Sequence, residues 1–123
     1  MATLLWIMLG GAVGTGARYL VAGLLNSADA GAFPYGTLTV NLVGCLLIGV
    51  LATLFGDATG TQAQLKLALI VGCLGGFTTF SAFGLEAFGL MQSGAMTSAA
   101  IYVLASNLGG ITLAWCGYKL AAG

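Results

Sequence analysis

The sequence predicts an all-α membrane protein made of a single transmembrane domain with four spanning helices. Of its 123 residues, 59% are hydrophobic and only 5% are charged. A soluble domain carries about 25% charged residues on its surface, so most of the outside of this chain must face lipid. A spanning helix needs about 20 mainly apolar residues. Four such stretches with their connections occupy positions 1–123, which leaves no room for a second domain.

Short segments of small and polar residues separate the four apolar stretches. The segments 26–34, 56–64 and 92–96 are rich in turn-forming residues and predict loops. The first stretch lacks the charged start of a signal peptide and is expected to stay in the protein. The spanning helices are therefore predicted at about 3–25, 35–55, 65–91 and 97–120.

Glycines within the predicted helices indicate where helix backbones approach each other. Gly10 and Gly14 lie four residues apart in the first helix, and Gly44 and Gly49 interrupt the second. Without a Cβ atom, such positions allow close helix packing within lipid. Most of the 21 glycines are explained by packing alone.

The third stretch has an unusual centre, the run GGFTTFS at positions 75–81. Two glycines followed soon by two β-branched residues are poor helix formers. The run lies near the middle of the span, where irregular backbone is tolerated only if protein or water covers it. Broken helices at this depth commonly form ion sites. The sequence favours a break at the bilayer midplane, and the alternative is a continuous helix with small residues at an interface.

The few cationic residues are almost evenly divided between the two sides of the membrane. Lys66 and Lys119 are predicted on the side of the N-terminus, and Arg18 lies toward the opposite side. Because Lys/Arg asymmetry sets orientation, this small bias predicts a chain that inserts both ways and pairs with an inverted copy. The alternative is that one orientation wins by a narrow margin.

Polar residues inside the second and fourth spans are candidates for a solute path. Asn41 lies at mid-span with Thr37 one turn before it, and Tyr102 and Ser106 are four apart on the fourth helix. A neutral amide offers two donors that can meet an anion. The same groups can instead bond neighbouring helices, and the sequence does not separate these alternatives. Asn107 is predicted to lie elsewhere around the fourth helix.

Two phenylalanines and two charged residues complete the candidate set. Phe80 and Phe83 share a face of the third helix, and the positive edges of aromatic rings can approach an anion, although packing is the ordinary role of phenylalanine. Glu86 is either a coupling or gating group or a wet carboxylate near the interface. Arg18 either extends to the surface or stands in a vestibule where it raises the local anion concentration.

Composition argues against several other classes of protein. The formal net charge is zero, so nothing indicates a nucleic-acid partner. Cys45, Cys73 and Cys116 show no paired CxxC spacing, and the chain contains no histidine, which argues against a zinc or redox motif. No catalytic dyad, phosphate loop or cofactor motif is present. An enzyme is therefore not expected.

Three segments resemble the signatures of the Fluc fluoride channels, also called the CrcB family. These are GGAVGTGARY at 10–19, GTLTVNLVG at 36–44 and GGFTTFSAF at 75–83. They occur in the family's order and cover the chain from near its start through the third helix. Two positions depart from the family pattern. Thr15 replaces a smaller residue, and Ala82 replaces the usual Thr, which leaves Ser81 to supply a hydroxyl there.

The resemblance implies a fluoride-selective channel in the bacterial inner membrane, built as an antiparallel homodimer with two separate pores. It also implies a structural Na⁺ at the dimer centre, bound by the backbone carbonyls of Gly75 and Thr78. The residues expected to line the fluoride pore are Asn41, Phe80, Phe83, Ser81, Tyr102, Ser106 and Thr37.

Two other functions are compatible with a chain of this size. A small multidrug exporter also forms inverted dimers of four-helix subunits, but that class relies on a glutamate in its first helix. No acidic residue occurs in the first helix of this chain, which counts strongly against an exporter. A structural membrane subunit that transports nothing is the second alternative.

Overall fold

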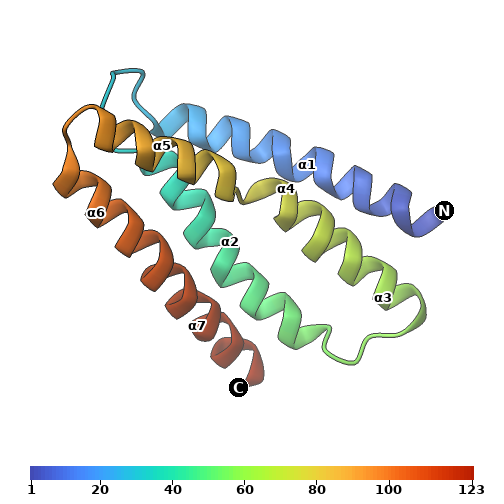
Figure 1. The fold of residues 1–123 in the computed structure, drawn as a ribbon. Coiled ribbons are helices and arrows are strands. Elements are labelled where there is room, and N and C mark those ends of the chain that lie inside the picture. The colour runs from blue at the N-terminus through green and yellow to red at the C-terminus, as the bar shows by residue number, and fades with distance from the viewer.

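The computed structural model describes residues 1–123 and consists of helices and connecting loops (Figure 1). Four helical segments are long and apolar enough to cross a membrane, which confirms the predicted all-α architecture with four spans. Both termini lie at the end of the bundle opposite the 26–34 loop (Figure 1). The four segments are Ala2–Leu25, Tyr35–Leu54, Gly60–Gln92 and Met96–Ala122.

The first two spans are single helices, whereas the third and fourth are each composed of several. The first span is α1 (Ala2–Leu25), and the second is α2 (Tyr35–Leu54). The third span comprises α3 (Gly60–Leu67), η1 (Ala68–Leu74), α4 (Gly75–Phe77) and α5 (Phe80–Gln92). The fourth span comprises α6 (Met96–Leu104), η2 (Ala105–Gly109) and α7 (Gly110–Ala122). The segments η1 and η2 are π-helical.

The third helical segment begins earlier than the sequence predicts. Its first residue is Gly60, not position 65, and the polar residues 60–64 form the first turns of α3. Hydropathy marks the residues that can enter lipid, but helical backbone can start before them in the polar interface. The expected loop is correspondingly shorter, and the other boundaries differ from the predicted ones by one or two residues.

Glycines bring two pairs of helices into backbone contact. Helix α1 packs against η1 and α4, and a Cβ atom on Gly14 would collide with the backbone of Cys73 and Phe77. Helix α2 packs against α7, where a Cβ atom on Gly49 would collide with the backbone of Ala114. These contacts agree with the close packing that the glycine spacing predicts.

Most apolar side chains face outward. Only 15 of the 123 residues are buried, as a small chain surrounded by lipid requires. The compact core lies between α5 and α6, where Phe83, Leu90 and Tyr102 pack together. This arrangement places one candidate aromatic and one candidate hydroxyl in the same core.

Two residues with extended backbone separate α4 from α5. Thr78 has φ −86° and ψ 160°, and Thr79 has φ −153° and ψ 127°. The Thr79 side chain accepts a hydrogen bond from the backbone N–H of Ala82 and so caps α5. The cap satisfies one of the donors that a helix start leaves without a partner.

Candidate functional site

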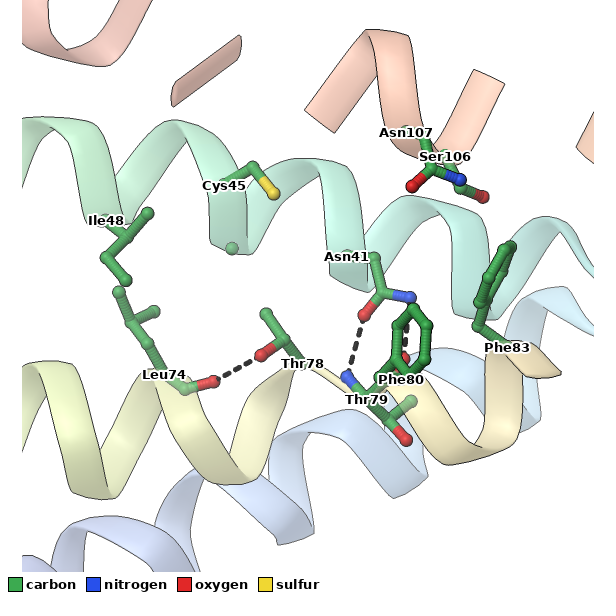
Figure 2. A pocket seen from close by; sticks show the side chains of 11 residues that line it. Asn41, Cys45, Ile48, Leu74, Thr78, Thr79, Phe80, Phe83, Ser106 and Asn107 are labelled. Atoms are coloured by element: carbon green, nitrogen blue, oxygen red, sulfur yellow. Dashed lines mark hydrogen bonds between the residues drawn. The ribbon is translucent and has the colours of Figure 1, made fainter. Parts of the chain in front are cut away.

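Asn41 connects α2 to the extended residues of the third span. Its Oδ1 accepts from the backbone N–H of Thr79 at 2.8 Å, and its Nδ2 donates to the carbonyl of Thr79 at 3.0 Å (Figure 2). The amide thus satisfies both backbone groups of one residue that lies outside any helix. An amide nitrogen carries two hydrogens, so one N–H of Asn41 stays free of these two bonds.

A cavity of about 250 Å³ lies beside this contact (Figure 2). Its lining includes residues of α2, of the extended pair Thr78 and Thr79, of α5 and of η2. Three of the four spans therefore border the cavity. The Ser106 hydroxyl is buried at its wall without any hydrogen-bond partner. The lining residues are Asn41, Gly44, Cys45, Ile48, Leu74, Thr78, Thr79, Phe80, Phe83, Ser106 and Asn107.

The two candidate phenylalanines both line this cavity but differ in burial. Their ring centroids are 5.5 Å apart, with the planes inclined by 42°. Phe83 is only 8% exposed, and its ring lies 5.1 Å from the ring of Tyr102. Phe80 is 81% exposed. Phe83 is therefore held by the core, whereas Phe80 lies at the outer edge of the cavity.

A second polar cluster forms around Glu86. The Thr37 hydroxyl donates to Glu86 Oε1, and the Tyr102 hydroxyl donates to Glu86 Oε2, each at 2.7 Å. Thr37 is 2% exposed, and the side chain of Asn26 donates to its hydroxyl at 3.4 Å. Glu86 is thus a half-buried carboxylate with a hydroxyl donor on each oxygen, and it connects three spans.

Arg18 points into the protein. Its Nε donates to the carbonyl of Gly76 at 2.9 Å. Arg18 also lines a second cavity, of about 330 Å³, together with Thr37, Thr79 and Glu86. Its hydrogen bond connects α1 to α4.

The structure groups the candidate residues into two neighbouring sets. Asn41, Phe80, Phe83 and Ser106 line the first cavity, together with Thr78. Thr37, Glu86 and Tyr102 are joined by hydrogen bonds. Of the other three candidates, Arg18 lines the second cavity, whereas Ser81 and Gly75 are exposed and line neither cavity.

Sequence reasoning missed three polar residues of the site. Thr79 precedes an apolar run, which is a recognisable helix-cap signal, but nothing local indicates its bonds to Asn41. Asn26 lies in the first loop, as predicted, and its Oδ1 accepts from the N–H of Gly36 at the start of α2, a contact that the loop pattern does not indicate. The prediction that Asn107 lies away from Ser106 is wrong, because both line the first cavity. The π-helical turn η2 changes the angular spacing on which that prediction depended.

These features define a small multi-pass membrane protein with a polar interior. Its first cavity is lined by the Asn41 amide, by Ser106 with its unpartnered hydroxyl and by two phenylalanines, and no acidic residue is among its lining residues. Such a set suits a small anion better than a cation.

Comparison with known proteins identifies the family. The sequence profile described as "CrcB-like protein, Camphor Resistance (CrcB)" matches residues 5–118. The chain is 41% identical to the fluoride-specific ion channel FluC of Methylobacillus flagellatus, over 98% of this chain and 94% of that protein. It is 44% identical to the channel of that name from Geobacter metallireducens, over 98% of each chain, and 47% identical to that of Rhizobium etli, over 81% and 80%. The chain belongs to the CrcB family, which confirms the resemblance seen in its motifs.

Proposed function

We propose that this chain is a fluoride channel that exports the ion passively across the bacterial inner membrane, and that it is not an enzyme. The observation that carries the proposal is the similarity of nearly the whole chain to relatives named fluoride-specific ion channels. The site is compatible with this function, because the first cavity combines neutral donors with aromatic edges.

The physical task of the pore is to replace the strong hydration of fluoride. In the proposed pathway the free N–H of Asn41 and the hydroxyl of Ser106 act as donors, and ring edges of Phe80 and Phe83 contribute weaker contacts. Conduction also requires binding that is weak enough to release the ion. Neutral donors meet this requirement better than a fixed cation would. Thr37, Ser81 and Tyr102 are proposed to continue the polar path, with Arg18 and Glu86 at its vestibule or gate.

Fluoride efflux from liposomes that contain only this protein tests the proposal. We expect rapid release of fluoride and little release of chloride, measured with ion-selective electrodes. A multidrug exporter would release neither ion and would instead move organic cations in exchange for protons. A purely structural subunit would move nothing. Absence of fluoride release from correctly inserted protein would contradict the proposed function.

Replacing the phenylalanines tests the role of the ring edges. Phe80→Ile and Phe83→Ile keep the cavity apolar but remove the aromatic edge. Aromatic pairs contribute about 0.5–1.5 kcal/mol beyond their burial, and each 1.4 kcal/mol is about a factor of ten. Taking this as the scale of a ring contact, we expect each variant to lower fluoride efflux about two- to tenfold while subunit assembly is retained. Efflux rates and size-exclusion profiles measure these two effects separately. If efflux is unchanged in both variants, the rings serve packing only.

The proposed assembly is an antiparallel homodimer with two pores. It is supported by the nearly even division of cationic residues and by the surface of the single chain. Phe80 is 81% exposed although it lines the cavity, and the amide of Asn107 is also exposed there. A polar side chain that faces lipid is costly. A second copy that covers this face would close the cavity.

Cysteine labelling tests the orientation of the two copies. Ala30→Cys in the first loop and Gly123→Cys at the C-terminus are introduced separately into a chain that lacks the native cysteines. In an antiparallel dimer, one of the two copies of each introduced cysteine faces one side of the membrane and the second copy faces the other side. An impermeant thiol reagent added outside sealed vesicles is therefore expected to label about half of each cysteine, and the remainder only after the vesicles are opened. Labelling of each site from one side alone would exclude the antiparallel dimer.

The proposal includes a structural Na⁺ at the dimer centre and a third helix that is interrupted at the bilayer midplane. Support comes from the backbone donors near the extended pair. In a continuous helix the N–H of Thr79 would bond the carbonyl of Gly75, and the N–H of Ala82 would bond the carbonyl of Thr78. These donors bond Asn41 Oδ1 and Thr79 Oγ1 instead. Two carbonyls in each copy thereby lose these helical partners and are suited to bind a hard cation.

A further inference from the structure

The fourth span contains a π-helical turn, η2, next to the proposed pore. Hydrogen bonds in a π-helix run between residues five apart, rather than four as in an α-helix. The turn contains the consecutive residues Ser106 and Asn107, which both line the first cavity (Figure 2). Single π-helical turns frequently occur at functional sites.

The side chain of Asn107 makes a hydrogen bond across the start of this turn. Its Nδ2 donates to the carbonyl of Val103 at 2.8 Å. In an α-helix the same carbonyl would accept the backbone N–H of Asn107. The side-chain amide therefore adds a bond within the turn and ties Asn107 to the residue that precedes Leu104 and η2.

The side chain of Ser106 makes no hydrogen bond that would hold the π-helical turn. Its hydroxyl is buried without a partner, although serine in a helix commonly donates to the carbonyl four residues before it. The chain that follows the turn approaches α2 closely, because a Cβ atom on Gly110 would come within 3.1 Å of Cys45 Sγ. The chain after η2 is thus held close to α2, and the bond from Asn107 holds the turn itself.

We propose that Asn107 is a positioning residue of the pore. Its bond to Val103 holds the π-helical turn that places Ser106 at the wall of the first cavity. The inference rests on the proposed function only for the part that Ser106 plays in conduction, since the geometry of the turn does not depend on which solute passes.

Accessibility of position 106 tests the proposal directly. Ser106→Cys, in a chain that lacks the native cysteines, is treated in liposomes with a small water-soluble methanethiosulfonate. Adding Asn107→Leu, which has similar volume but no donor, is expected to slow modification about fivefold, as loss of one hydrogen bond predicts. Adding Asn107→Ser, whose hydroxyl can bond the same carbonyl, should restore most of the rate. Leu108→Met, an exposed change in the same turn, is the matched control and should leave the rate unchanged.

Fluoride efflux, measured on variants that keep Ser106, completes the test. Asn107→Leu should lower efflux about fivefold, and Asn107→Ser should restore most of it. Asn107→Asp keeps the shape of the side chain but cannot donate when ionised, and it replaces Asn107→Leu if the latter does not assemble. If position 106 is modified at the same rate with Asn107 as with Leu at position 107, the proposal is overturned. This holds even if Asn107→Leu lowers efflux, because Asn107 would then act directly on the ion. If the parent protein releases no fluoride, the proposed function fails while the modification rates still decide the role of Asn107.

Discussion

Asn41→Asp is expected to lower fluoride efflux about a thousandfold. Two unit charges 4 Å apart interact by about 4 kcal/mol at an effective dielectric constant of 20, and each 1.4 kcal/mol corresponds to about a factor of ten. An ionised aspartate would therefore raise the free energy of a fluoride ion at this position by about this amount. It would also lose the bond from Asn41 Nδ2 to the carbonyl of Thr79 and place a carboxylate oxygen against that carbonyl. Both effects act against permeation.

Two companion variants separate the effect of charge from the loss of the structural contact. Asn41→Ala removes both bonds to Thr79 without adding charge, and we expect a clearly smaller loss of efflux than in Asn41→Asp. Thr39→Val changes an exposed residue of α2 whose hydroxyl bonds only the carbonyl of Tyr35, and it should keep full efflux. Liposome efflux at matched protein content, with size-exclusion chromatography as a check of assembly, gives the comparison. Wild-type efflux from assembled Asn41→Asp protein would remove Asn41 from the pore.

The four spans could be predicted from composition, but the rotation of each helix could not. Helices that are apolar on all sides have no hydrophobic stripe to orient them, so the sequence left both roles open for Asn41 and Glu86. The structure pairs Asn41 with Thr79, 38 residues away, and Thr37 with Glu86, 49 residues away. Such contacts depend on how the spans pack together, and no local pattern encodes them.

The π-helical turns were also beyond sequence reasoning. Spacing of three or four residues assumes α-helical geometry, and η1 and η2 violate that assumption in two of the four spans. Tyr102 and Ser106 were placed on one stripe, yet the Tyr102 hydroxyl bonds Glu86 while Ser106 lies at the first cavity. The glycine contacts were predictable, because a missing side chain has the same consequence whichever helix faces it. Gly14 against Cys73 is the clearest case.

The proposed sodium site depends on the same rearrangement of donors that fixes the extended pair. Asn41 and the Thr79 hydroxyl take the N–H groups of Thr79 and Ala82. The carbonyls of Gly75 and Thr78 then lack the helical partners that a continuous third helix would give them. Within a membrane, carbonyls without partners are costly. In an antiparallel dimer two such pairs approach the two-fold axis, where a small hard cation with oxygen ligands would remove the cost. Its charge would also offset part of the cost of bringing anions into the protein.

Removal of sodium is therefore expected to abolish efflux and weaken the dimer. The protein is purified and reconstituted with N-methylglucamine as the only bulk cation, and fluoride efflux, bound sodium and subunit mass are each measured. We expect about one sodium per dimer before removal, loss of efflux after it, and recovery of both efflux and dimer when sodium is returned. Bound sodium should not exchange faster while fluoride flows, because the ion is structural and is not carried with fluoride. Full efflux from an intact dimer that contains no sodium would show that the Gly75 and Thr78 carbonyls are satisfied in another way.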